Sequence, residues 1–413
     1  MNTHLPRGRN FLAAHPTLNL AGAGIALVAV CYGLARFGYG YFIPVFRAEF
    51  NLSPMTVGFF AAASYTAYCA AILAAIALTP ALGGRALSII SGLLAALALT
   101  AIATAANAAV LGLAVAATGF CTGLVSPPLA ALMAEQVAPK YQNRVQTMVN
   151  SGAGIGVVLS VPVAMAASSN WRLAWLVFAA LAILSTWWIA RSSPQRSPRT
   201  GSRKGLGGIS QLLPRPLLPT GSIGVLLGAA FFGAAGTAML TFGRDFMVTT
   251  GSHPEAATTT AWVLLGACGL LGAVAGNLVT KFGLRTCWIA GCAAMAAAIT
   301  LFASFPNTAL VAVVSMALFG GAYTTASGFL LLWGTKVYQK TPATGVGLAF
   351  LLIALAQAVV TPLLGMLQSG HGPYLPFYLT AAIAAGACAI KPHIPPEPIT
   401  LLMEIIPNPK VTQ

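Results

Sequence analysis

Residues 191–216 read RSSPQRSPRTGSRKGLGGISQLLPRP and form the one long hydrophilic connection in this chain of 413 residues. Arginine, serine, proline and glycine dominate the segment, and such a composition cannot bury enough apolar surface to form a core. We therefore predict a basic linker. It separates an N-terminal part, residues 1–190, from a C-terminal part, residues 217–391, and a tail follows at residues 392–413.

On both sides of the linker, apolar segments alternate with short polar or Gly/Pro-containing connections. The chain is 58% apolar and only 7% charged, and a membrane-spanning helix needs roughly 20 apolar residues. The composition excludes an ordinary soluble protein and predicts an all-α integral membrane protein. Twelve transmembrane segments are expected, six before the linker and six after it: 18–45, 55–78, 86–106, 108–134, 145–167, 172–190, 217–247, 256–279, 286–305, 308–333, 345–367 and 374–390.

The charges of the connections are strongly asymmetric. Lysine and arginine number 21 against 6 acidic residues, and most of them fall on one side if the N-terminus is cytoplasmic. Because cytoplasmic loops carry the excess of positive charge, we expect both termini in the cytoplasm. The orientation in the membrane thus accounts for the excess of basic residues, and no nucleic-acid partner is expected. It predicts a multi-pass protein of the cell's inner or plasma membrane.

The two parts repeat at a constant offset of 200 residues. The offset pairs glycines, prolines, loop cations and a turn asparagine at equivalent places in the topology: Gly33 with Gly233, Pro54 with Pro254, Gly83 with Gly283, Arg85 with Arg285, Asn107 with Asn307, Lys140 with Lys340, and Pro162 with Pro362. An even number of spans in each part gives a parallel repeat about an axis along the membrane normal. We predict two pseudo-symmetric six-helix bundles.

The turns after the second and eighth spans carry a family resemblance. The later turn keeps Gly276, Lys281, Gly283 and Arg285, and has Thr280 where the family pattern G-x-x-x-D-x-x-G-R-[RK] has an acid. The earlier turn keeps only Gly83, Gly84 and Arg85. With the six-plus-six organisation, these turns resemble those of the major facilitator superfamily (MFS). The resemblance implies the MFS fold and interdomain turns whose charges latch the two halves.

The first span resembles one branch of that superfamily. Residues 33–44 read GLARFGYGYFIP, and a turn of sequence FNLS follows at residues 50–53. Both are similar to the YbfB/YjiJ-like branch, whose members are largely transporters of unassigned substrate.

Arg36 is the leading candidate for substrate binding. It falls within the first span, where a charge is expensive and is retained only with a partner or a function. Tyr32 and Tyr39 lie four residues before it and three after it, on the same face of an α-helix. An arginine between two tyrosines offers a fork and aromatic walls to a carboxylate, phosphate or phenolate. The alternatives are an arginine reaching out of the membrane or one paired structurally with another helix.

Two carboxylates are candidates for proton coupling. Glu135 ends the fourth span, and Asp245 ends the seventh beside Arg244. The alternative for each is a local ion pair, Arg244–Asp245 at one site and Glu135 with Lys140 or Arg144 at the other.

Neutral polar residues within spans are further candidates for the substrate cavity. Asn150, Tyr323 and Gln357 are the ones we expect to bind substrate, and bonding between helices is the alternative for each.

We therefore expect a secondary transporter that moves a small solute by alternating access, with an organic anion as cargo and a proton or charge gradient as driving force. Scattered cysteines and histidines predict no metal site. The absence of a G-x-x-x-x-G-K-[ST] loop excludes ATP as energy source within this chain. We further expect that the chain is not an enzyme, that it needs no cofactor, and that it is a monomer in the lipid bilayer. The alternative is a receptor, sensor or enzyme on a helical bundle.

Overall fold

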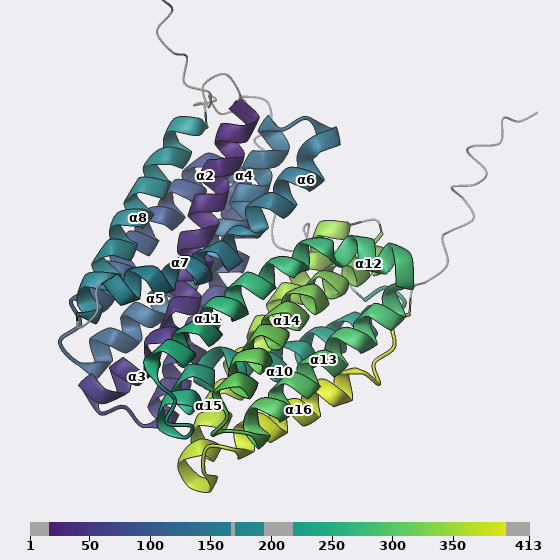
Figure 1. The fold of residues 1–413 in the computed structure, drawn as a ribbon. Helices are drawn as coiled ribbons and strands as arrows, with labels where there is room; N and C mark the ends of the chain where they lie inside the picture. Colours follow the sequence, from purple (N-terminus) through teal and green to yellow (C-terminus); the bar gives the residue numbers. More distant parts are fainter. Residues whose placement is uncertain (1–15, 167–169, 194–217, 340, 394–413) are drawn as a thin grey trace, which may run out of the picture.

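The computed structural model describes residues 16–166, 170–193, 218–339 and 341–393, and these residues form helices with no β-strand. Most of the linker and of the C-terminal tail predicted above lies outside the described residues. Two groups of helices make up the molecule, and Figure 1 shows the first, purple to teal, at the upper left and the second, green to yellow, at the lower right.

The first half begins with a long interrupted helix. Its elements in chain order are α2 (Pro16–Val28), the π-helix η1 (Ala29–Phe37), α3 (Gly38–Phe50), α4 (Pro54–Ala103), α5 (Ala108–Gln136), α6 (Pro139–Asn150), α7 (Gly152–Ala166) and α8 (Trp171–Ser192). The start of α2 and the end of α8 lie together, because the indole nitrogen of Trp188 donates to the amide oxygen of Asn19 at 2.8 Å.

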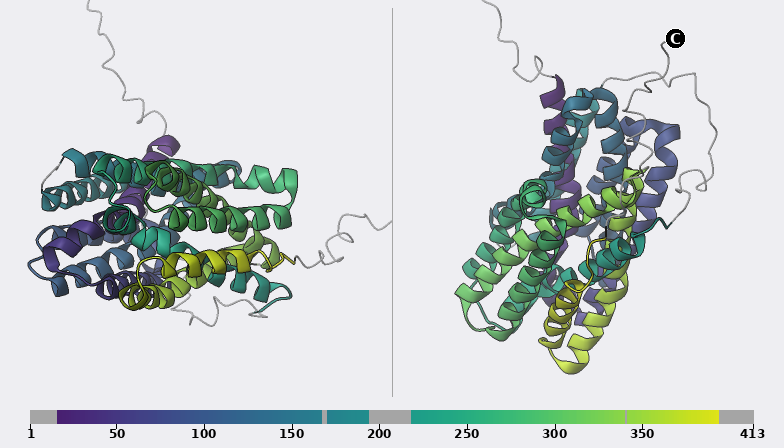
Figure 2. Two further views of the ribbon diagram at one scale, coloured as in Figure 1. Left: turned by 60° about the horizontal axis from the view of Figure 1, so that its bottom comes forward. Right: turned by 90° about the vertical axis from the view of Figure 1, so that its right-hand side faces the viewer.

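The second half repeats this order with different interruptions. It comprises α10 (Ser222–Thr249), α11 (Glu255–Gly269), the 3₁₀ segment η2 (Leu270–Val274), α12 (Ala275–Phe282), α13 (Leu284–Ser304), α14 (Ala309–Val337), α15 (Pro342–His371) and α16 (Leu375–Ala387). The two views of Figure 2 show both halves as bundles of roughly aligned helices.

Within the described residues, ten helices are long and apolar enough to cross a membrane. The sequence predicted twelve spans, and two features account for the difference. α4 consists of two helical arms, the predicted second and third spans, which meet at the non-helical backbone of Gly83 and count as one of the ten, and α16 has only 13 residues. Counting both arms of α4 and adding α16 gives twelve apolar helical segments, so the predicted fold class is confirmed.

The turns at Gly83 and Gly283 have the same backbone conformation. Their φ and ψ angles are 81° and 156° at Gly83 and 79° and 151° at Gly283. This region of φ/ψ space is essentially restricted to glycine. The offset of 200 found in the sequence therefore corresponds to a repeated geometry.

The two halves pack tightly along α3, α4, α10 and α15. A Cβ added at Gly40 would lie 2.5 Å from the carbonyl oxygen of Leu240, and one at Gly58 would lie 2.8 Å from that of Thr361. Glycine is required at both positions because the backbones of opposite halves approach so closely. At the other end of the molecule, α6 and α12 stand apart in Figure 1.

Candidate functional site

Arg36 lies between the two halves, against aromatic rings of α4. Its guanidinium carbon is 4.2 Å from the ring centroid of Tyr68 and 4.9 Å from that of Tyr65. Both tyrosines are buried. Such distances give cation–π attraction, which strengthens where water is excluded.

The predicted walls of Arg36, Tyr32 and Tyr39, take different places around it. Tyr39 lines the same small cavity as Arg36, whereas Tyr32, which lies with Arg36 in the π-helix η1, contacts the ring of Tyr68. The Tyr32 hydroxyl lies 3.2 Å from that of Tyr68 and 2.7 Å from that of Ser126.

Tyr39 turns into the first half. Its hydroxyl donates to the carbonyl oxygen of Val57 at 3.1 Å, and its ring stacks on Phe46. Tyr32 thus supports the aromatic wall from behind, whereas Tyr39 anchors α3 to α4.

The second half completes the site with Gln357 and Tyr323. Nη2 of Arg36 donates to Oε1 of Gln357 at 3.3 Å, and Nε2 of Gln357 donates to the Tyr323 hydroxyl at 3.5 Å. The Tyr323 ring stacks between Phe232 and Phe319. We call Arg36, Tyr65, Tyr68, Tyr323 and Gln357 the central cluster. The central cluster joins the two halves through the hydrogen bond from Arg36 to the uncharged side chain of Gln357.

The positive charge of Arg36 has no acidic partner among the side chains that the structure describes. The ion pairs found there are Arg47–Asp245 and Arg172–Glu49. Nε of Arg36 is buried without a hydrogen-bond partner. A cavity of about 20 Å³ lies beside the guanidinium, room for about one water molecule. The site is therefore cationic and nearly closed.

Asp245 pairs across the halves with Arg47 of α3. The local Arg244–Asp245 pair considered from the sequence is wrong, because Arg244 instead donates to the Tyr41 carbonyl oxygen at 2.6 Å and lies 3.9 Å from the Tyr41 ring centroid. Asp245 is 1% exposed and Arg47 is 24% exposed. We call Arg47, Asp245, Arg244 and Tyr41 the latch, since each contact joins α3 to α10.

Glu135 and Asn150 lie away from these contacts. Glu135 is exposed at the end of α5, and its suggested partners, Lys140 and Arg144, have side chains outside the described set. Asn150 is exposed on α6, and its amide oxygen accepts from Gln146 at 3.0 Å. The structure therefore does not bring Asn150 into the central cluster.

The predicted interdomain turns hold no latch within the described residues. Arg85 donates to the carbonyl oxygens of Ala190 and Ser193, both at 2.9 Å, and so caps α8 of its own half. Lys281 and Arg285 are exposed, as are Gly276 and Gly283. Among the described residues, the ion pair that joins the two halves is Arg47–Asp245, which lies between α3 and α10 and not at these turns.

Sequence reasoning missed Tyr65, Tyr68, Arg47 and Tyr41. Tyr65 and Tyr68 are spaced three apart in an apolar span, which places two hydroxyls on one helix face and is the signal that was available. Arg47 gave no such signal, because its partner lies 198 residues away.

Comparisons with known proteins agree with this architecture. Residues 25–361 match the Major Facilitator Superfamily. A relative from Pseudomonas aeruginosa, named transcription regulatory protein OpdE, is 25% identical over 247 residues, which are 58% of this chain and 60% of that protein. This chain thus spans less than two thirds of that relative's length.

Two solved transporters share the fold. A mutant of the nucleoside transporter NupG has a TM-score of 0.71 and 12% identity, covering 91% of this chain and 98% of that one. A bacterial homologue of the human lysosomal transporter Spinster, inward-facing and occupied, has a TM-score of 0.72 and 15% identity, covering 93% and 97%. With helices of membrane-spanning length and a sequence match across both halves, this chain belongs to the Major Facilitator Superfamily.

Proposed function

We propose that this transporter carries a small organic anion and that Arg36 binds its anionic group. The observation that carries the proposal is the unneutralised guanidinium between the two halves. A charge inside a membrane protein is costly and is retained where it pairs or functions. Here its hydrogen-bond partner, Gln357, is neutral.

The chemistry of the central cluster favours a carboxylate. A guanidinium presents paired N–H donors that match the two oxygens of a carboxylate. Tyr65 and Tyr68 add flat aromatic faces beside it. We expect a substrate with an anionic end and a planar or apolar body, with Tyr323 and Gln357 contributing from the second half and Tyr32 holding Tyr68 in place.

Binding also offers a means of coupling to alternating access. Gln357 occupies one donor of Arg36 in the nearly closed site. A carboxylate that replaces this contact interacts with both halves, so its arrival changes the relative stability of their arrangements. On the topology expected from the loop charges, the latch lies at the external end.

A proton or charge gradient is the proposed driving force. Protonation of Asp245 removes the charge that holds Arg47, which links proton uptake to opening of the latch. Glu135 remains the second candidate, at the opposite end of the molecule. Asn150 lies on an exposed face of α6 and is retained as a candidate lining residue of the open pathway.

The finer assignments complete the proposal. We place the chain in the YbfB/YjiJ-like branch, as a monomer in the inner or plasma membrane with both termini cytoplasmic. The domains are residues 1–190 and 217–391, joined by the linker at 191–216 and followed by the tail at 392–413.

Uptake into proteoliposomes tests this function. The panel pairs acetate, benzoate, 4-hydroxybenzoate and succinate with their neutral amides, with and without a pH gradient. We expect a carboxylate to be carried and its amide not, Arg36→Ala to abolish uptake, and Arg36→Lys to weaken it because the fork is lost. Arg172→Ala, which removes a partly exposed cation from an ion pair within the first half, is the matched control and retains uptake. Full uptake by well-expressed Arg36→Ala overturns the proposal.

A further inference from the structure

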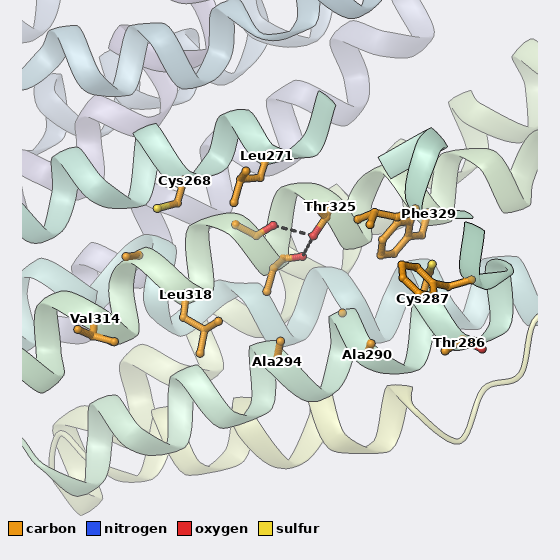
Figure 3. Close-up of a pocket in the computed structure, with 16 residues that line it drawn as sticks. Cys268, Leu271, Thr286, Cys287, Ala290, Ala294, Val314, Leu318, Thr325 and Phe329 are labelled. Carbon is orange, nitrogen blue, oxygen red and sulfur yellow. Dashed lines mark hydrogen bonds between the residues drawn. The ribbon is translucent and has the colours of Figure 1, made fainter. Parts of the chain in front are cut away.

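The second half contains a large apolar cavity remote from the central cluster. It measures about 710 Å³ and lies between α11 with α12 on one side and α13 and α14 on the other (Figure 3). Its lining includes Leu271, Phe282, Ala294, Leu318 and Phe329. The volume is in the range of small-molecule sites.

The internal repeat accounts for part of this space. Of the α13 residues that line the cavity, three are smaller than those 200 residues earlier: Cys287, Ala290 and Ala294 stand where the first half has Leu87, Ile90 and Leu94. In the first half, Leu87 is buried and packs in a cluster with Ala71, Ala75 and Leu124, against which Leu94 also packs. The same place is thus filled in one half and hollow in the other.

The rim of the cavity faces the bilayer. Leu271, Val314 and Leu318 are 53%, 53% and 40% exposed on helices of membrane-spanning length. The hydroxyl of Thr325, on the wall, already donates to the carbonyl oxygen of Gly321 at 2.7 Å (Figure 3). An apolar space open to lipid, in which the hydroxyl of Thr325 is bonded to its own helix, suits a hydrocarbon chain.

Two basic side chains, those of Lys281 and Arg285, lie at one end of the cavity. Nζ of Lys281 lies 5.1 Å from the ring centroid of Phe282, which lines the cavity. Arg285 is exposed and directly precedes Thr286, also in the lining. Residues 276–286 contain no acid to neutralise them. Basic side chains at the start of a spanning helix attract anionic lipid headgroups.

We propose that this cavity binds one anionic phospholipid, with an acyl chain between α12, α13 and α14 and its phosphate at Lys281 and Arg285. The chain supplies the apolar volume that leucine side chains supply in the first half. A ligand that binds the folded protein stabilises it, so this lipid holds α12 against α13. The site is independent of the proposed anion site at Arg36.

Native mass spectrometry of delipidated protein, titrated with palmitoyl-oleoyl phosphatidylglycerol or with the phosphatidylcholine of the same chains, tests the proposal. We expect phosphatidylglycerol to bind more tightly than phosphatidylcholine. Lys281→Gln and Arg285→Gln should each weaken phosphatidylglycerol binding about fivefold, and should weaken phosphatidylcholine binding less, because that lipid has the same phosphate but no net negative charge. Ala290→Ile with Ala294→Leu, which imports the first half's residues, should displace both lipids.

Ala297→Leu is the matched control, since it adds the same bulk to an exposed position of α13 outside the cavity lining and should retain both affinities. Lys281→Gln and Arg285→Gln change exposed side chains, so they still test the proposal if the variant that fills the cavity, Ala290→Ile with Ala294→Leu, folds poorly. Equal affinity for the two lipids, undiminished binding by a folded filled variant, or equal competition by glycerol 3-phosphate without acyl chains would each overturn the proposal.

Discussion

The guanidinium of Arg36 and the amide of Gln357 meet across the two halves of the transporter, with Nη2 donating to Oε1 at 3.3 Å. The two residues are 321 positions apart. Because the acceptor is neutral, the contact positions the arginine without cancelling its charge. The pair therefore defines where an anionic group is expected to bind.

Gln357→Glu places a carboxylate at this position. We expect the new ion pair to occupy the donors of Arg36 and to weaken binding of the transported carboxylate at least about tenfold, while a neutral amide analogue is unaffected. Isothermal titration in detergent measures both affinities. Gln357→Asn, which adds no charge, is the control and should have the smaller effect. An unchanged carboxylate affinity in Gln357→Glu would place the substrate elsewhere.

Loss of the latch pair should open its end of the molecule. Breaking this partly buried ion pair leaves the charge of Arg47 uncompensated, and Asp245→Asn is expected to raise the open population about tenfold. Spin labels at Ala48 and Ser252, exposed residues near the latch, report the distance between the halves. The exchange of Arg47→Asp with Asp245→Arg should restore the short distance.

Glu49→Gln serves as the comparison for the latch, because it breaks the exposed pair with Arg172 inside the first half. Its distance distribution should match that of the unaltered protein. If Asp245→Asn also matches it, Arg47–Asp245 does not hold the halves together.

Gly83→Ala and Gly283→Ala should destabilise the protein equally. Both positions have positive φ, and a methyl group added at either would meet open space, so the penalty is backbone strain, about 1–3 kcal/mol of unfolding free energy. Gly276→Ala is the matched control, since Gly276 is helical and equally open. Denaturant unfolding in micelles measures all three. A loss at Gly276 as large as at Gly283 would contradict the strain argument.

Much of the architecture was predictable from the sequence because the bilayer imposes long apolar segments. The same repeat that pairs Gly83 with Gly283 in the sequence reappears in their backbone angles.

The candidate site was predictable only in part. Arg36, Tyr323 and Gln357 stood out as polar residues in apolar spans, and the structure brings them together. The rings stacked against Arg36, those of Tyr65 and Tyr68, were not predicted because they belong to α4 and reach Arg36 only through helix packing. The sequence suggested Arg244 as the ion-pair partner of Asp245. The partner in the structure, Arg47, comes close to Asp245 only through packing of the two halves.

The most direct test of the account is a chemical double-mutant cycle between Arg36 and the anionic group of the substrate. Binding of the best-transported carboxylate and of its carboxamide is measured for the unaltered protein and for Arg36→Ala. We predict a coupling free energy of about 1.5–3 kcal/mol, the value of a hydrogen bond to a charged group. A coupling of zero, with both ligands losing the same affinity, would contradict the assignment of Arg36 as the anion-binding residue.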